Sequence, residues 1–394
     1  MTQPEAYLVR QPMASPFTHG AHRRQTSDSV VLRWTRGALT GIGECAPRRY
    51  VTGEDCESVL ADLARIDFDR LGRTLATHDP IDRGRNLYEH GLPWLPEDAG
   101  NNTRCLVEMV VLDALAHQAE LPLATYLRQV TDVVGRGTLP AQVNITQVLD
   151  LSQPVAAFFE QRNPVGALKV KLADDPRANL QRLASIRALG PPLSLYVDPN
   201  MSWSPEQLFT YHRQFRPVNV ALFEEPLPKG SFDDYRRARL DQGIAIMLDE
   251  SVTSPASLEQ AFRHQALDAV NLRIAKCAGL LTTIKMIEQC RLWEMPVYLG
   301  VQVAEVGPLI AAHRALLTVY DGFIGVEAGQ HDRFFTSTLI DPVPAVDRQH
   351  NAIHLSAPSR PGLGCTLTPD VAPYRYELGS AGHCQTPLRL ERVR

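Results

Sequence analysis

The feature that most constrains the fold is a series of short apolar runs separated by amphipathic segments in the middle of the chain. Segments such as 175–189, 204–215 and 254–264 place apolar residues three and four positions apart, which is typical of helices. The apolar runs are rich in strand-forming residues and end on charged or amide side chains: ALKVK (167–171), LSLYVDPN (193–200), NVALFEEP (219–226), IAIMLDES (244–251) and AVNLRIAK (269–276). This alternation predicts βα units around a parallel sheet.

Three consecutive predicted strands end on a carboxylate. Asp198 and Glu224 are 26 residues apart, and Glu224 and Asp249 are 25 apart, which is close to one βα unit per step. In a βα barrel these three acids would lie at the C-terminal rim, where sites are built. A single acid there could instead cap the following helix. Three in register favour a Mg²⁺ site, because hard carboxylate oxygens suit that ion.

The strand ends also carry a set of motifs that resembles the enolase superfamily, and within it the muconate lactonizing enzyme subgroup, over nearly the whole chain. Lys169-Val170-Lys171 is similar to the Lys-x-Lys of the second barrel strand, and Asp198 with Asn200 to the Asp-x-Asn of the third. Phe-Glu-Glu-Pro around Glu224 and Asp-Glu-Ser at 249–251 are similar to the metal-binding segments of the fourth and fifth strands. Glu305 resembles the Glu that ends the seventh strand.

The resemblance implies roles for these side chains. It makes Lys171 the base, with Lys169 as a neighbouring cation that tunes it, and Asp198, Glu224 and Asp249 the Mg²⁺ ligands. Mn²⁺ would suit the same oxygens. Two oxygens of a substrate carboxylate on the metal would stabilise an enolate, and burial beside another cation would lower the pKa of Lys171.

The sixth strand departs from the family pattern. Where the family has Lys-x-x-Lys before a Gly pair, this chain has Arg273-Ile-Ala-Lys276-Cys-Ala-Gly279. Alternation along a strand predicts that Arg273 faces inward and that Lys276 points away. Glu250 would then pair with Arg273. Because a guanidinium is normally always protonated, Arg273 fits a fixed cation better than a second base.

The sequence therefore predicts a Mg²⁺-dependent enzyme that acts on a small carboxylate. A one-base reaction at Lys171 favours elimination of a β-substituent or cycloisomerisation. One alternative is a racemase or epimerase of an amino-acid derivative or dipeptide in which Arg273 or another group serves as the second acid or base. The other is a barrel that binds a ligand without turnover.

Two polar segments near the N-terminus are candidates for substrate selection. Residues 15–28 and 47–55 are read as loops between strands of a small antiparallel sheet, and loops of this length are often functional. The resemblance implies that they close over the barrel mouth. The candidate specificity residues are His19, His22, Arg48, Arg49 and Tyr50.

The predicted fold is α/β, a (β/α)8-type (modified TIM) barrel with an α+β capping domain. Residues 1–138 form the N-terminal part of the capping domain, 139–330 the barrel, and 331–394 a C-terminal segment that completes the capping domain. Strands one, seven and eight of the barrel are expected at 142–148, 297–305 and 322–329. Ser204 with Gln207 predicts a capping box. Glu108, Asp113 and His117 are interpreted as a polar edge or as satisfied buried groups, with no metal role.

Bulk properties exclude several classes of protein. The 394 residues suit a barrel plus a second domain, and a net charge of −4 provides no basic field for nucleic acid or anionic membrane. No apolar run reaches membrane-spanning length, and the N-terminus lacks a signal-peptide pattern. Seven scattered cysteines predict reduced thiols of a cytoplasmic protein. We expect a homo-oligomer.

Overall fold

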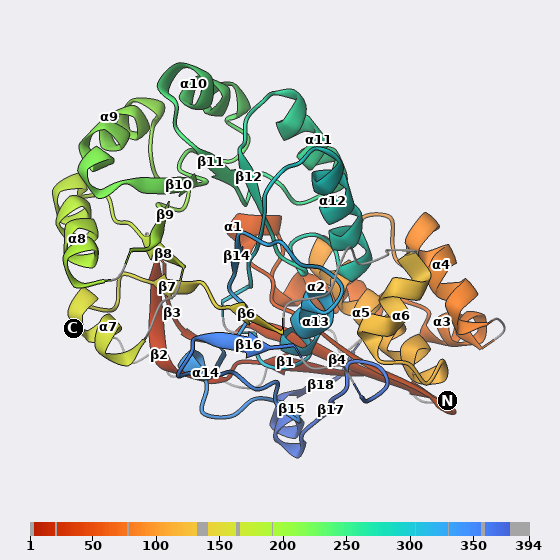
Figure 1. Ribbon diagram of the computed structural model, residues 1–394. Coiled ribbons are helices and arrows are strands. Elements are labelled where there is room, and N and C mark those ends of the chain that lie inside the picture. Colours follow the sequence, from red (N-terminus) through yellow and green to blue (C-terminus); the bar gives the residue numbers. More distant parts are fainter. Residues whose placement is uncertain are drawn as a thin grey trace.

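The molecule consists of a parallel barrel and a cap built from both ends of the chain (Figure 1). The computed structural model describes residues 4–19, 22–76, 79–131, 141–162, 166–190, 192–303, 305–329, 331–355 and 359–378. The predicted fold class is confirmed, because an eight-stranded parallel sheet lies beside an antiparallel cap sheet.

The barrel strands follow one another in chain order, from β7 to β14, and each pairs in parallel with the next. Thr146, next to the first strand, donates its backbone N–H to the Val326 carbonyl of the last at 2.7 Å, which brings the two edges together. The strands are β7 (Gln147–Leu149), β8 (Ala167–Lys171), β9 (Ser194–Asp198), β10 (Val220–Glu224), β11 (Ile246–Leu248), β12 (Ala269–Leu272), β13 (Val297–Leu299) and β14 (Gly325–Val326).

Among the described residues, seven helices cover the outside of the barrel, one after each of the first seven strands. Several start with proline, whose fixed φ suits the first turn. The predicted capping box is confirmed, since Ser204 accepts the Gln207 N–H and the Gln207 side chain accepts the Ser204 N–H. The helices are α7 (Val155–Gln161), α8 (Pro176–Leu189), α9 (Pro205–Phe215), α10 (Phe232–Gln242), α11 (Pro255–Arg263), α12 (Leu280–Leu292) and α13 (Pro308–Leu317), and a 3-10 turn, η1, spans Arg216–Val218.

Three barrel strands are shorter than predicted. The run at 142–148 divides into β6 (Gln142–Asn144), which pairs antiparallel with β16 (Ala352–His354), and the barrel strand β7. β13 and β14 end at Leu299 and Val326, well before the ends of the predicted runs. The apolar residues beyond them belong to the rim of the barrel, where they leave the ladder to line the site.

The cap sheet has the order β18-β1-β4-β5, so strands from both ends of the chain meet in it. β18 pairs with β1, which shows that the C-terminal segment returns to the cap as predicted. The exact boundaries stay predictions, and 138 lies outside the described residues. The strands are β1 (Glu5–Val9), β4 (Ser29–Arg36), β5 (Leu39–Cys45) and β18 (Arg375–Tyr376).

Helices pack on this sheet, and α5 lies against β5. They are α2 (Cys56–Ala64), α3 (Phe68–Leu75), α4 (Pro80–His90), α5 (Asn101–Gln118) and α6 (Leu123–Thr131). The C-terminal segment adds α14 (His331–Phe334), β15 (Ile340–Asp341), β17 (Thr366–Leu367) and the 3-10 helix η2 (Pro369–Tyr374). One apolar core joins cap and barrel.

The predicted N-terminal loops are more ordered than expected. Much of 15–28 belongs to a hairpin of β2 (Pro12–His19) and β3 (His22–Thr26), in which His19 is the register partner of His22. Residues 47–55 contain a short helix, α1 (Arg49–Thr52). Proline and basic residues in 15–28 give the segment a low strand propensity, so its sequence resembles a loop. The hairpin depends on cross-strand pairing more than on propensity.

A buried carboxyl group ties the cap to the barrel. Glu44, on β5, accepts the backbone N–H groups of Val306, Gly307 and Leu309 at 2.7 to 3.1 Å, at the start of α13. Burial, and next the nearby Glu305, raise the pKa of Glu44 to about 7. The three N–H donors oppose this shift without cancelling it.

Two further acids make similar ties. Asp113 accepts the N–H of Ile42 at 2.9 Å and of Leu363 at 2.7 Å, and so joins α5, β5 and the C-terminal segment. Glu108 accepts the N–H of Leu281 at the start of α12, at 3.0 Å. Both are therefore satisfied buried groups, as the sequence predicted.

Glu44 should make stability depend on pH. Its pKa is raised from 4.5 to about 7 in the folded state, so between these values the unfolded chain loses a proton that the folded protein keeps. Glu44 therefore contributes up to about 3 kcal/mol to the free energy of unfolding at low pH, and this contribution is lost as the pH rises through this window. We expect Glu44→Gln to flatten the change in urea unfolding free energy between pH 5 and pH 8. Glu57→Gln, at an exposed position of α2, should retain the wild-type slope, and an unchanged slope in Glu44→Gln would contradict this assignment.

Candidate active site

The site is built as a layer of inward-facing side chains above the closed interior of the barrel. The interior is filled by a buried cluster of Ala167, Tyr196, Met247, Ala269 and Tyr298, with Leu222 packed against it. Because side chains alternate along a strand, the residue two positions further on faces inward as well. These next inward residues are Lys169, Asp198, Glu224, Asp249 and Asn271.

Two of the three predicted metal ligands contact lysines of the Lys-x-Lys segment. Lys171 Nζ lies 2.5 Å from Asp198 Oδ2 and donates to Asn200 Oδ1 at 3.1 Å. Lys169 Nζ lies 3.0 Å from Glu224 and 3.6 Å from Asp198. Burial raises the pKa of Asp198, but Lys171 and Lys169 outweigh it and hold the value at about 2. The predicted residues from β8, β9 and β10 therefore do come together.

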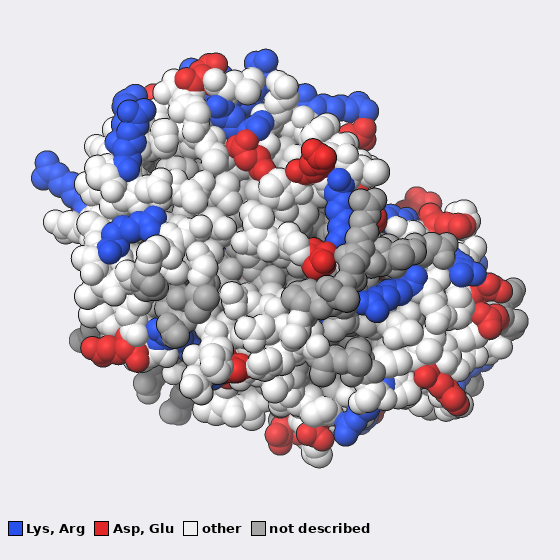
Figure 2. Space-filling view, in the orientation of Figure 1, with Lys and Arg blue, Asp and Glu red and all other residues white. Residues whose placement is uncertain are grey.

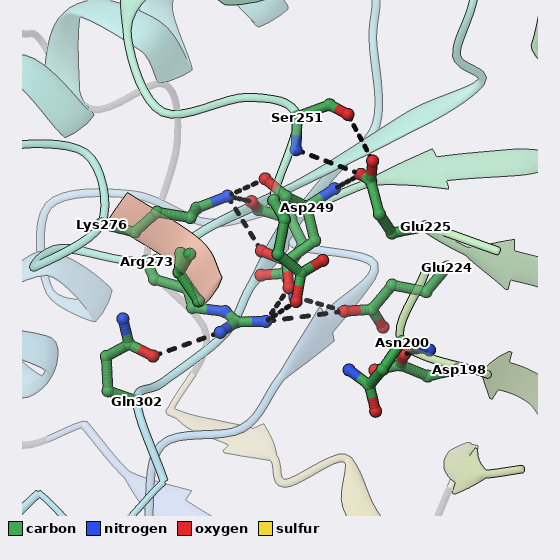
Figure 3. Close-up of polar contacts among 12 residues, drawn as sticks. Asp198, Asn200, Glu224, Glu225, Asp249, Ser251, Arg273, Lys276 and Gln302 are labelled. Carbon is green, nitrogen blue, oxygen red and sulfur yellow. Dashed lines mark hydrogen bonds and ion pairs between the residues drawn. The ribbon is translucent and has the colours of Figure 1, made fainter. Parts of the chain in front are cut away.

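The third predicted ligand, Asp249, lies among different cations (Figure 3). Arg273 Nη2 forms an ion pair with Asp249 Oδ2, and Lys276 Nζ lies 2.9 Å from Oδ1. The backbone N–H of Asp249 donates to Glu225 at 2.7 Å, and Ser251 donates to the same carboxylate. Glu225, which the sequence analysis did not single out, thus fixes the strand end that carries Asp249.

The structure adds Glu327 to the site. It follows β14 and contacts Lys169 Nζ at 2.5 Å, while Tyr298 donates its hydroxyl to Glu327 at 3.0 Å. Burial alone would lower the pKa of Lys169, but Glu224 and then Glu327 raise it well above its usual value. Lys169 is therefore held as a cation beside Lys171, and its tuning role stays a prediction.

The prediction that Lys276 points away from the site is wrong, because its side chain contacts the predicted metal ligand Asp249. β12 ends at Leu272 and residues 274–278 form turns, so strand alternation does not extend to Lys276. Its ammonium group contacts the Asp249 side chain and donates to the carbonyls of Asp249 and Asn271, both at 2.6 Å. Burial, with Arg273 nearby, lowers the pKa of Lys276 to about 8. Lys276 does not line the central cavity.

Arg273 faces inward as predicted. Besides its pair with Asp249, its Nη2 lies 3.9 Å from Glu250 Oε1, the expected partner. Its Nη1 donates to Gln302 Oε1 at 3.2 Å. Burial, and next the neighbouring carboxylates, raise the pKa of Glu250 to about 8. Arg273 thus connects the carboxylate layer with the residues after β13.

A cavity of about 40 Å³ lies at the mouth of the barrel, above these side chains. A larger cavity of about 430 Å³, between α6, α13 and the C-terminal segment, contains none of the site residues. The smaller cavity is identified as the site because it is lined by the predicted catalytic residues Lys169, Lys171 and Arg273. Its lining residues are Phe17, Tyr50, Val148, Lys169, Lys171, Asn200, Glu250, Arg273, Val301, Gln302, Val303, Glu327 and Phe334.

The candidate specificity residues are divided by the structure. Tyr50, on α1, lines the cavity. Arg49 is exposed and pairs with Asp55, away from the lining. Arg48 is buried and donates to the Val303 carbonyl, so it holds the cap against the barrel rim. The side chains of His19 and His22 lie outside the described part of the chain, and their role stays a prediction.

Glu305 supports the rim from behind the cavity. It accepts the backbone N–H of Gln302 at 2.8 Å and lies 3.3 Å from His313 Nε2 on α13. It lines a neighbouring cavity of about 20 Å³ together with His313 and His331. It does not line the central cavity, and its role in substrate binding or in support of the site stays a prediction.

Comparisons with known proteins identify the family. The model of enolase C-terminal domain-like proteins matches residues 154–371, more than half of the chain. The chain belongs to the enolase superfamily. Mg²⁺-dependent enolate chemistry is general to this superfamily of enzymes.

Individual members of the superfamily are similar over most of their length. A D-Ala-D/L-Ala epimerase of Cytophaga hutchinsonii is 27% identical, over 81% of this chain and 84% of its own. A chloromuconate cycloisomerase of Pseudomonas putida is 26% identical, over 92% and 95%. The solved dipeptide epimerase from Cytophaga hutchinsonii, in complex with Mg and the dipeptide D-Ala-L-Val, superposes with a TM-score of 0.76 at 22% identity, over 95% and 98%. This last likeness shows the fold.

The donor set of this enolase-superfamily protein fits a hard divalent cation. Asp198, Glu224 and Asp249 are at most 1% exposed, and Glu224 Oε2 and both Asp249 oxygens accept no hydrogen bond from any described residue. The negative charges of these oxygens are instead compensated by ion pairs with Lys169, Arg273 and Lys276. Within the described residues no three acidic, His or Cys side chains form a ready ligand group, which we attribute to the lysines and Arg273 lying against them.

Proposed function

We propose that this protein abstracts the proton α to the carboxylate of a small acid with Lys171 and eliminates a β-substituent, or, in the reverse direction, closes a ring by intramolecular addition and receives the α-proton from Lys171. The observation that carries the proposal is the convergence of Lys171, Lys169 and three buried carboxylates from four consecutive strands, with the two lysines lining the cavity at the barrel mouth. Buried ionisable groups in a cleft with specific charge partners are typical of active sites.

Lys171 supplies the base. Lys171 lines the cavity, and its Nζ donates to Asn200 Oδ1, which orients the side chain. Lys169 stays charged beside Glu224 and Glu327 and places a second cation next to Lys171. The cap residues Phe17 and Tyr50 close the cavity and reduce the access of water.

Asp198, Glu224 and Asp249 would hold Mg²⁺, or Mn²⁺ through the same oxygens. The bound ion would stabilise the negative charge that develops on the substrate carboxylate when the α-proton leaves. Support comes from the chemistry of the donor set and from the Mg²⁺ dependence of the superfamily.

In the proposed reaction, Lys171 is the single base. Arg273 directly follows β12, which lies four strands away from β8, the strand of Lys171, and so on the opposite wall of an eight-stranded barrel. Its guanidinium pairs with Asp249 and serves as a fixed cation. Lys276 is committed to Asp249 and Asn271 and does not line the cavity, so it supplies no acid to the opposite face. Lys171 therefore removes the proton and returns it to the leaving group on the same face.

Arg273→Lys separates this reaction from epimerisation. The variant keeps the charge but loses the planar fork, so we expect turnover to fall by about tenfold or more. The new ammonium group should also open a route for protons from the face opposite Lys171. We expect the wild type to incorporate deuterium at the α-carbon with retention only, and Arg273→Lys to begin to invert. Ready inversion by the wild type would instead favour the epimerase alternative.

The function itself is tested by incubating the Mg²⁺-loaded protein with a set of small carboxylic acids in D₂O. NMR should detect exchange of the α-proton in at least one of them, faster than without protein. If no acid with an α-proton exchanges, the proposed base chemistry is overturned.

We also infer that the protein works in the cytoplasm, as a homo-oligomer, on a small molecule, with no role for nucleic acid or membrane. The six cysteines of the described residues are buried free thiols, which supports a reducing compartment. Lys and Arg are interspersed with Asp and Glu on the face in Figure 2. No helix in the described part of the chain is long and apolar enough to cross a membrane.

A further inference from the structure

The cavity of about 430 Å³ lies away from the active site and is enclosed by three parts of the molecule. Its walls come from α6 of the cap, from α13 of the barrel and from the C-terminal segment, and the two helices are in contact (Figure 1). Leu123, at the start of α6, donates its backbone N–H to the Gly362 carbonyl at 2.7 Å, which holds two of the walls together. Ligand pockets usually measure about 300–1,000 Å³, so this cavity has the size of a pocket that is already formed.

Most of the wall is apolar. On α13 the wall consists of two alanines one turn apart, Ala311 and Ala315, whose small side chains leave the space between the helices open. The other walls add larger aliphatic groups. The apolar side chains that a ligand would meet include Leu123, Ala124, Ala311, Ala315, Leu355 and Leu363.

The charged side chains of this cavity are all basic. Arg314, on α13, and Arg360 line it, and none of its lining residues is acidic. Arg314 Nη2 donates to the Ala345 carbonyl at 3.3 Å, but no described carboxylate forms an ion pair with this guanidinium. Burial, and next the nearby Arg348, lower the pKa of Arg314 to about 10, so it stays charged at neutral pH. Arg360 is exposed and likewise forms no ion pair with a described residue.

The other two ionisable residues of the wall do not offset this positive charge. His354 Nε2 lies 2.9 Å from Asp347, which is outside the lining. Burial raises the pKa of the Cys365 thiol to about 12, so the thiol is neutral at pH 7. Charges that are withdrawn from water are normally paired with an opposite charge. The attraction of Arg314 for an anion in the cavity depends on their distance, and not on which of its N–H groups faces the cavity.

We propose that this cavity is a second binding site, separate from the active site, for an organic anion with an apolar body. The aliphatic walls would hold a hydrocarbon chain or ring, and Arg314 with Arg360 would attract the anionic group. The ligand class is therefore a carboxylate of medium chain length or a close relative of one. This inference does not depend on the reaction proposed above.

The test compares octanoate with octan-1-ol, which has the same chain but no charge. Calorimetry on the metal-free protein should show one octanoate bound per chain with a Kd of about 1 mM or below. Octan-1-ol should bind about tenfold or more weakly, because it lacks the charge-assisted contact. Arg314→Gln should weaken octanoate binding by about tenfold or more and leave the binding of octan-1-ol unchanged.

A second variant, Arg360→Glu, changes an exposed residue, so its effect does not depend on repacking of the wall. It should weaken octanoate binding by about threefold or more. Arg236→Glu, at an exposed position of α10, makes the same charge change outside the cavity and should retain the wild-type affinity. Lys171→Ala should retain it as well, since Lys171 lines the active site.

Three results would overturn the inference. They are the absence of saturable octanoate binding, equal affinity of the wild type for octanoate and octan-1-ol, and wild-type octanoate affinity in both Arg314→Gln and Arg360→Glu. Loss of octanoate binding in Lys171→Ala would place the ligand in the active site and would also contradict a second site.

Discussion

Lys171→Ala should reduce exchange of the substrate α-proton by about 10²- to 10⁴-fold, the range by which a positioned general base accelerates proton transfer. Lys171 lines the cavity, as Lys169 does, and its ammonium group contacts both Asp198 and Asn200. Alanine removes the base, but Lys169 remains at 3.6 Å from Asp198 and still compensates part of the negative charge of that buried carboxylate. The measurement is deuterium incorporation by NMR with an acid that the wild type exchanges.

Two controls make this result specific. Mg²⁺ affinity, measured by calorimetry, should not fall in Lys171→Ala, because no metal ligand has been removed. Lys285→Ala, on α12 over the Tyr88 ring, changes a lysine outside the cavity and should exchange at the wild-type rate. If Lys171→Ala also exchanges at that rate, the base is another residue.

Asp249→Asn should weaken Mg²⁺ binding by well over about tenfold, because the site would lose one of its three carboxylate charges. It should also lower the free energy of unfolding by about 3–5 kcal/mol, the usual effect of removing one partner of a buried ion pair. Asp249 is fully buried and faces both Arg273 and Lys276, which would be left without their carboxylate. Calorimetry with Mg²⁺ and urea unfolding measure the two effects.

The two effects of Asp249→Asn have separate interpretations. Unchanged Mg²⁺ affinity in a folded variant would remove Asp249 from the ligand set, whatever its stability. Unchanged stability would show that the ion pairs with Arg273 and Lys276 contribute little. Asp233→Asn, at an exposed position at the start of α10, should change neither quantity.

The barrel and its carboxylates were predictable because both depend on regular spacing. One carboxylate per βα unit, at the ends of three consecutive predicted strands, predicted that Asp198, Glu224 and Asp249 lie at one rim of the barrel. The period-2 rule for strands failed at Lys276, since β12 ends at Leu272 and residues 274–278 form turns. Alternation is informative only as far as the strand extends.

The residues that the sequence did not reveal belong to irregular or very short segments. Glu327 follows a strand of two residues, so no periodic pattern marks it, although its position at the end of the eighth predicted strand was a usable signal. Gln302 lines the cavity and contacts Arg273, which follows the neighbouring strand β12, and spacing along the chain does not encode this contact. In the hairpin of β2 and β3, cross-strand pairing overrides a sequence that resembles a loop.

The ion pairs of the carboxylate layer have a consequence for the order of events in the cell. Lys169, Lys171, Arg273 and Lys276 already compensate the charges of Asp198, Glu224 and Asp249. Small domains whose metal supplies the folding energy stay unfolded until the ion arrives. A newly synthesised chain of this protein could instead complete its fold first, and metallation would be a late exchange of one set of cations for another.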